Sequence, residues 1–142
     1  MRLEGWEGRL DAVIDAARHE AYELGRHDCF RFACQVVHAL IGVDRWPEFA
    51  GYRTHREALA KIAAYGSSFE AAGDWFFGVG RSTARLARRG DIVALRTKDG
   101  MKHLGICIGE RVAVLAEEGL TFLPLTEDPQ APVTMICSWR ID

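Results

Sequence analysis

The chain has 142 residues, of which 49% are hydrophobic and 27% are charged, and its formal net charge is −2. These values are typical of one globular domain with a hydrophobic core, and they exclude a protein that binds nucleic acid through a strongly basic surface. No apolar run approaches 18 residues and the first turns of the chain contain charges, so we expect no membrane segment and no secretion signal.

The first part of the chain has the apolar spacing of amphipathic helices. Residues 3–24 carry apolar side chains three or four positions apart, which predicts a first helix. Residues 29–41 are expected to form a second helix, because Asp28 is a good N-cap and Gly42 is a good residue to follow the last turn. Cys29 therefore lies in the first turn of the second helix, at the head of its apolar side.

Shorter helices are expected before the chain changes to strands. Residues 43–52 contain a proline, a glycine and several aromatic residues without a period, and they predict a loop. Thr54 and Glu57 have the spacing of a capping box, which predicts a helix that ends at about Tyr65. A weaker signal of the same kind predicts a short helix over residues 68–74.

From Arg89 onward the apolar side chains alternate with a period of two, which is typical of β-strands. Asp99-Gly100 is a hairpin signal between the first two strands. The expected strands cover residues 91–96, 102–108, 111–116, 120–125 and 133–141. Helices first and an antiparallel meander second predict an α+β fold in a single domain, residues 1–142, with a helical half over about 1–88 and a sheet half over about 89–142.

The thiol of Cys29 has two interpretations. Free cysteine is among the most buried residue types, so Cys29 can be a small core residue. The unpaired N–H groups at a helix N-terminus also stabilise an anion, and reactive cysteines of low pKa are often found there. A reactive thiol still needs a base to accept its proton.

His103 is the candidate for that base. In the strand over residues 102–108, alternation places His103, Gly105 and Cys107 on one face, and Gly105 leaves space beside the imidazole. If the sheet packs against the helices, the imidazole can meet the thiol of Cys29. Such a pair serves acyl transfer, because the imidazole accepts the thiol proton and returns it to the leaving amine. The alternative for His103 is a partly exposed strand residue near a hairpin.

Three short segments follow one another in the chain as Tyr22-x-x-Gly25-x-x-Asp28-Cys29, Gly90-Asp91-Ile92-Val93 and His103-Leu104-Gly105-Ile106-Cys107-Ile108-Gly109. In this order they resemble the motifs of the NlpC-type cysteine peptidases, which are bacterial and phage cell-wall hydrolases of the papain-like clan. The resemblance covers roughly residues 22–116. It implies a papain-like fold, with the N-terminal helices packed on the C-terminal antiparallel sheet.

The resemblance also implies roles for individual residues. Cys29 would be the nucleophile and His103 the general base, and the backbone N–H of Cys29 would be one oxyanion donor. Tyr22 would supply a hydroxyl at the same site. Asp28 would be the cap of the nucleophile helix rather than a participant in the chemistry.

The chain departs from the family pattern in two places. Phe30-Arg31 follow the Asp-Cys pair, where the family commonly has small residues. The family also places a polar residue about a dozen positions after the base to orient the imidazole, whereas this chain has Val114-Leu115-Ala116. Glu117 is the first polar side chain there and is the candidate orienter. Loss of the orienting group in a hydrolytic triad can lower the rate by several orders of magnitude.

By resemblance, the expected function is that of a hydrolase, a cysteine peptidase or amidase that acts on peptidoglycan peptides through an acyl-enzyme at Cys29. The sequence around Cys29 is also similar to small proteins encoded among phage and prophage tail genes and in gene-transfer-agent clusters. This similarity implies a virion component at the tail tip, made in the bacterial cytoplasm, with tail-tip or baseplate proteins as partners.

Two other functions use the same fold. A structural tail-tip component could serve as a docking module with weak or absent catalysis, and an exposed patch of aromatic residues would favour it. The aromatic residues in question are Trp46, Phe49, Tyr52, Trp75, Phe76 and Phe77. An acyltransferase would use the pair of Cys29 and His103 without hydrolysis.

The sequence predicts no metal and no cofactor. His27, Cys29, His103 and Cys107 carry atoms that bind zinc, but their spacing matches no established zinc pattern. The four cysteines form no CxxC pair, so we expect reduced thiols rather than a disulfide framework.

Overall fold

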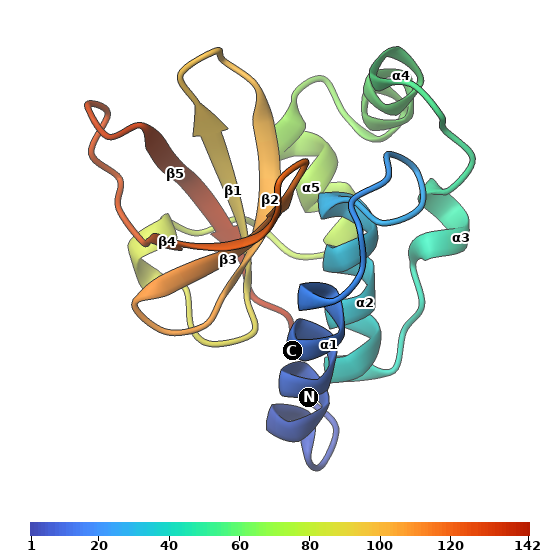
Figure 1. Cartoon of the computed structure of the whole chain (residues 1–142), viewed down its shortest axis with the longest axis vertical. Coiled ribbons are helices and arrows are strands. Elements are labelled where there is room, and N and C mark those ends of the chain that lie inside the picture. The colour runs from blue at the N-terminus through green and yellow to red at the C-terminus, as the bar shows by residue number, and fades with distance from the viewer.

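In the computed structural model, which describes residues 1–142, helices come first and a sheet follows (Figure 1). The helices are α1 (Trp6–Arg18), α2 (Cys29–Ile41), α3 (Trp46–Phe49), α4 (His55–Tyr65) and α5 (Phe69–Phe77), and a 3-10 turn, η1 (Ala84–Leu86), comes after them. The strands are β1 (Ile92–Thr97), β2 (Lys102–Cys107), β3 (Arg111–Ala116), β4 (Gly119–Pro124) and β5 (Val133–Trp139). All strand pairs are antiparallel, which confirms the predicted α+β class. None of the helices combines the length and the apolar character needed to cross a membrane.

The sheet has the strand order β4-β3-β2-β1-β5, so the last strand returns to pair with the first. β2 pairs with β1 along most of its length, whereas it pairs with β3 only at Ile106↔Ala113 and Cys107↔Val112. The first half of β2 therefore has no strand partner on its β3 side. The start of α2 packs against β2 at this open edge.

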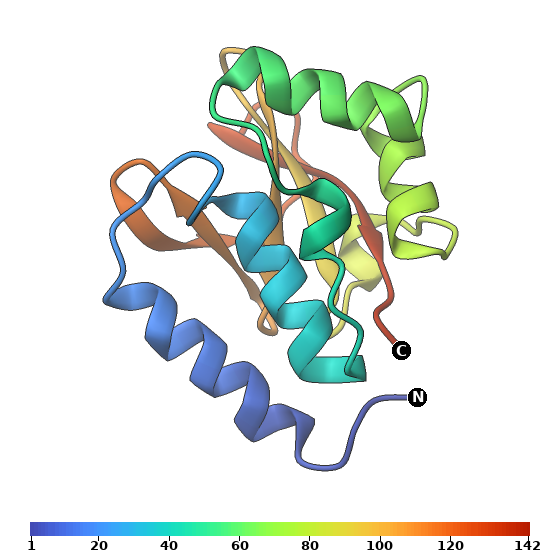
Figure 2. The ribbon, with the colours of Figure 1, turned by 90° about the vertical axis from the view of Figure 1, so that its right-hand side faces the viewer.

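The main core lies between α1, α2 and one face of the sheet. From α2, Phe32, Val36 and Leu40 are completely buried in it. Each such side chain stabilises the folded state by roughly 1.5–3 kcal/mol when it leaves water. Figure 2 shows α1 and α2 side by side in front of the sheet. The other fully buried large members are Leu10, Ile92, Ile106, Leu115 and Trp139.

The first helix is shorter than predicted. The apolar spacing suggested residues 3–24, whereas α1 spans Trp6–Arg18. Leu24, which continued the helical pattern, instead lines the cleft described below, together with Tyr22. Residues that face a cleft have the same apolar spacing as residues that face a core, which explains the error.

A tight turn replaces the end of the predicted helix. The backbone groups of Glu23 and His27 hydrogen bond to each other across it. Gly25 adopts a positive φ of 83°, and a Cβ atom there would come within 2.2 Å of the carbonyl oxygen of Tyr52. The turn therefore requires glycine, and it delivers the chain to the N-terminus of α2.

The exposed aromatic patch that would favour a docking function does not form. Phe49, Tyr52 and Phe76 are buried in a separate hydrophobic cluster against α2, where Phe49 packs edge to face on both other rings. Of the six residues considered, Trp75 alone is largely exposed. The segment predicted to be a loop contains α3, and α5 extends beyond its predicted end to Phe77. These two helices direct most of the aromatic rings toward the interior.

Candidate functional site

α4, the β1–β2 hairpin and the N-terminal end of α2 lie at the same end of the molecule (Figure 1). A cleft of about 360 Å³ lies between them. Cys29 from α2, His103 from β2 and Tyr22 from the loop before α2 all line this cleft. The structure therefore brings the expected nucleophile, base and hydroxyl into one cavity, although they come from separate segments of the chain.

A buried carboxylate fixes the start of the Cys29 helix. Asp28 is 1% exposed, and its oxygens accept hydrogen bonds from the backbone N–H of Arg31 at 2.9 Å and of Gly25 at 2.8 Å. The hydroxyl of Tyr52 also donates to this carboxylate. Burial and the bond to Asp28 raise the pKa of Tyr52, so the hydroxyl stays a donor. Tyr52 lies in a segment without a period, and no sequence signal indicated this contact.

The thiol of Cys29 is neutral in this environment. Its side chain is almost completely buried, and burial raises the pKa of the thiol to about 12, with a further increase from the charge of Asp28. The backbone N–H groups of Leu104, Cys29 and Phe30 act in the opposite direction and lower it. The helix N-terminus thus has the expected effect on the sulfur, but the cost of removing a thiolate from water is larger.

His103 is half-buried at the start of β2, on the wall of the same cleft. Burial lowers the pKa of its imidazole, the charge of Asp99 raises it, and His55 lowers it again, for a net decrease. The neutral imidazole can accept a proton at neutral pH. No hydrogen bond joins His103 to Cys29, and neither residue contributes to the pKa shift of the other.

The predicted space beside the imidazole is occupied. A Cβ atom on Gly105 would lie 2.5 Å from Cγ1 of Val112 and 3.2 Å from Cδ2 of Leu95. Gly105 therefore makes room for β3 and β1 side chains rather than for His103, and that expectation was wrong. The two-residue period was correct, but it does not show which neighbouring strand fills a gap.

Glu117 is not placed as the orienter of His103. It lies exposed at the turn between β3 and β4, and its negative charge raises the pKa of Tyr22 rather than acting on the imidazole. The carboxylate that acts on His103 belongs to Asp99, in the β1–β2 turn, where it accepts a hydrogen bond from the backbone N–H of Met101. The sequence showed Asp99 only as a turn residue.

Tyr22 keeps its proton at neutral pH. Burial and the nearby charges of Cys29, Asp28 and Glu117 raise the pKa of its hydroxyl to about 12. A protonated phenol on the cleft wall is a hydrogen-bond donor. Tyr22 can therefore donate to a developing negative charge next to Cys29.

The other zinc-type side chains lie outside the cleft. His27 is buried behind α2, with Nδ1 3.2 Å from Oε2 of Glu20. Cys107 is buried with Val93, Leu95 and Val112 in a smaller cluster on the face of the sheet away from α2. All four cysteines are free thiols, and no three histidine, cysteine or acidic side chains gather as a metal site.

Comparison with known proteins gives a family but no function. No curated protein matches the chain, and no solved structure matches it. Residues 1–134 match a family that is described as a domain of unknown function, DUF6950. Because the match covers nearly the whole sequence, the chain belongs to the DUF6950 family.

Proposed function

We propose that the chain is a cysteine peptidase or amidase of the papain-like, NlpC type that forms an acyl-enzyme at Cys29. The observation that carries this proposal is that Cys29 and His103 line one cleft. The packing of the Cys29 helix on an antiparallel sheet agrees with a papain-like fold. The nucleophile and its base then come from the helical half and the sheet half of the domain.

The two pKa shifts favour a neutral thiol with a neutral imidazole in the resting site. In the proposed reaction His103 takes the thiol proton while the sulfur attacks the substrate carbonyl, so that a C–S bond forms and an oxyanion develops. The imidazolium then protonates the leaving amine as the C–N bond breaks. A water molecule, deprotonated by the same imidazole, hydrolyses the thioester and restores the thiol.

In this proposal two donors stabilise the oxyanion. The backbone N–H of Cys29 lies at the unpaired N-terminal end of α2, where amide groups favour negative charge. The hydroxyl of Tyr22 lines the same cleft and stays protonated. Such donors lower the barrier because they are already oriented when the charge forms.

For the substrate, we propose peptidoglycan peptides, and for the setting, a tail-tip component of a phage or prophage particle. Both parts of the proposal rest on the resemblance of the Tyr22-to-Cys29 and His103-to-Gly109 segments to the NlpC-type motifs.

A second candidate function is a structural tail-tip component with weak or absent catalysis. Three features of the site favour it. Cys29 is 7% exposed, Cys29 and His103 share no hydrogen bond, and the charge of Glu117 does not contribute to the pKa shift of the imidazole. A pair that never meets would leave the cleft available only for binding.

Cleavage of purified peptidoglycan fragments, followed by mass spectrometry of the products, separates the two functions. We expect the wild-type chain to cleave, and Cys29→Ala and His103→Ala to lose about 100-fold or more in rate. Cys34→Ala is the matched control, because this thiol is buried on the same helix but lies outside the cleft. Absence of cleavage by the wild type would favour the structural function, and equal cleavage by Cys29→Ala would refute the proposed nucleophile.

A further inference from the structure

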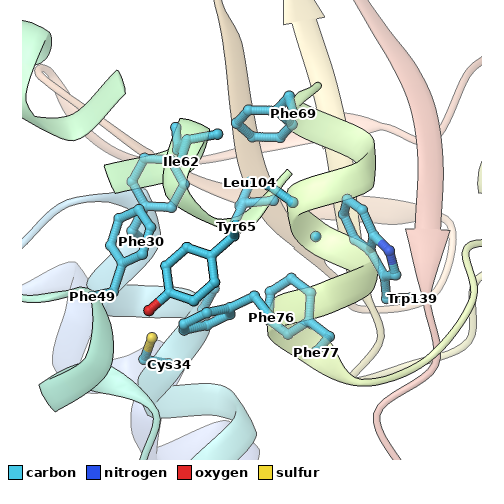
Figure 3. A pocket seen from close by; sticks show the side chains of 13 residues that line it. Phe30, Cys34, Phe49, Ile62, Tyr65, Phe69, Phe76, Phe77, Leu104 and Trp139 are labelled. Atoms are coloured by element: carbon cyan, nitrogen blue, oxygen red, sulfur yellow. The ribbon is translucent and has the colours of Figure 1, made fainter. Parts of the chain in front are cut away.

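A second, apolar cavity lies behind the Cys29 cleft. It has a volume of about 30 Å³, and 12 of its 13 lining residues are hydrophobic. Figure 3 shows aromatic rings around it, with Phe30, Ile62, Phe69 and Leu104 at one end and Phe76, Phe77 and Trp139 at the other. No side chain that lines it carries a formal charge.

One wall separates this cavity from the cleft. Phe30, Ile62 and Phe69 line both spaces, and they come from α2, α4 and α5. The ring of Phe30 lies 6.1 Å from the ring of Phe69. The two spaces are therefore neighbours that share side chains, not separate features of the surface.

The wall is next to the nucleophile. Phe30 directly follows Cys29 in the first turn of α2. Leu104 of β2 lies between the sulfur of Cys29 and the apolar cavity. Its backbone N–H faces the sulfur, and Leu104 also lines the cavity. An acyl group bound to the sulfur of Cys29 would therefore begin beside this wall.

The charged groups of the cleft belong to other parts of its lining. Lys102 is paired with Glu70 at 2.7 Å, and the carboxylate of Asp28 accepts hydrogen bonds from Gly25, Arg31 and Tyr52. A side group that lies against Phe30, Ile62 and Phe69 meets only carbon. A charged side group would lose its hydration there without gaining a partner.

We propose that Phe30, Ile62 and Phe69 form an apolar subsite for the side group next to the reacting carbonyl of the acyl donor. This inference rests on the proposed acylation of Cys29, and it adds the chemical class of the acyl group, which is compact, uncharged and apolar. The wall limits its size, since the cavity beyond has room for about one water molecule. Removal of the Phe30 ring joins the two spaces and admits a larger group.

Alkylation of Cys29 tests the subsite without any need for hydrolysis. The probes are iodoacetamides whose amide nitrogen carries an isobutyl, a benzyl or a carboxymethyl group, and the rates are divided by those with N-acetylcysteine. Peptide mapping by mass spectrometry identifies the modified cysteine. We expect the isobutyl probe to modify Cys29 about tenfold faster than the carboxymethyl probe, because a difference of this size is typical of an apolar pocket.

Variants of the wall give the sharper comparison. Phe30→Ala should raise the relative rate of the benzyl probe about tenfold, and Ile62→Ala, at a half-buried position on α4, should act in the same direction. Phe76→Leu is a matched control, because Phe76 lines the apolar cavity but not the cleft. Circular dichroism establishes that each variant is folded, and Ile62→Ala tests the wall even where Phe30→Ala does not fold.

Equal normalised rates for all three probes would overturn the subsite, as would an unchanged benzyl rate in both folded wall variants. Failure of the proposed function has a different signature. In that case Cys29 would alkylate with the expected selectivity, but no acyl donor would acylate it in a manner that depends on His103.

Discussion

At pH 8, Cys29 should react with iodoacetamide about 1,000-fold more slowly than an exposed cysteine. Burial raises the pKa of its thiol from 9.0 to about 12, and the thiolate is the reactive form. A pKa that is higher by three lowers the thiolate fraction of Cys29 about 10³-fold relative to an exposed cysteine, at any pH where both thiols are mostly protonated. The rate should then rise about tenfold for each pH unit up to about pH 11.

Mass spectrometry of the peptide that contains Cys29 gives this rate between pH 7 and pH 11, with N-acetylcysteine in the same tube as the reference. Tryptophan fluorescence at each pH limits the comparison to the folded protein. His103→Ala should leave the pH dependence unchanged, because no resting ion pair is expected. A rate that levels off below pH 9 in the wild type but not in His103→Ala would refute the neutral resting thiol and favour a thiolate-imidazolium pair.

Four further predictions follow from the same contacts. The free energy of unfolding should fall above pH 9, because the thiols of Cys29 and Cys34 have pKa values of about 12 when folded and release their protons from about pH 9 when unfolded. The loss is roughly 1 kcal/mol per thiol at pH 10. Equal urea midpoints at pH 8 and pH 10 would contradict this prediction. Tyr52→Phe removes a donor to the buried Asp28 carboxylate and should cost about 1–3 kcal/mol in urea unfolding, whereas a change below the error of the measurement would show that the bond contributes nothing. Gly105→Ala places a Cβ atom against Val112 and should lower the free energy of unfolding by about 1–3 kcal/mol. If the clash with Val112 is the cause, adding Val112→Ala should recover part of this loss, and no recovery would contradict it. Hydrolysis should decline at acid pH through a pKa below the 6.5 of free histidine, because burial lowers the pKa of His103 and its protonated form cannot act as a base; a decline centred above pH 7 would contradict it.

Local signals predicted the start of the site well. Asp28 and Cys29 depend on neighbours within one helical turn, and the capping preference of Asp and the position of the thiol follow from the sequence itself. The alternating strand that carries His103 is equally local, and the structure has it as β2. These signals could not predict the environment of the thiol. The helix N-terminus favours a thiolate, and only the three-dimensional packing shows that the effect of burial on the pKa is larger.

Contacts between distant segments account for the rest. Tyr52 reaches Asp28 from a segment without a period, and Leu104 meets the sulfur because β2 lacks a strand partner at that edge. The position of Glu117 was predicted from a family spacing, but the turn between β3 and β4 directs its charge to Tyr22. The number of residues between two positions does not determine where their side chains point when the strands belong to a twisted sheet.

The subsite wall shows the same limit. Phe30 was noticeable in the sequence as a large residue where small ones are common in the NlpC-type pattern. Its partners Ile62 and Phe69 lie on separate helices, and only their arrangement around two adjacent spaces gives the ring a role.

Acylation of Cys29 with His103 as its base is tested most directly by the protein mass after reaction with p-nitrophenyl acetate at pH 7. The reaction breaks the ester C–O bond, forms a thioester at Cys29 and releases p-nitrophenolate, so the chain gains one acetyl group. We predict that the wild type and Cys34→Ala gain this group on the peptide that contains Cys29, and that His103→Ala gains it about 100-fold more slowly. An unmodified Cys29, or an equal rate in His103→Ala, would contradict the proposed catalytic pair.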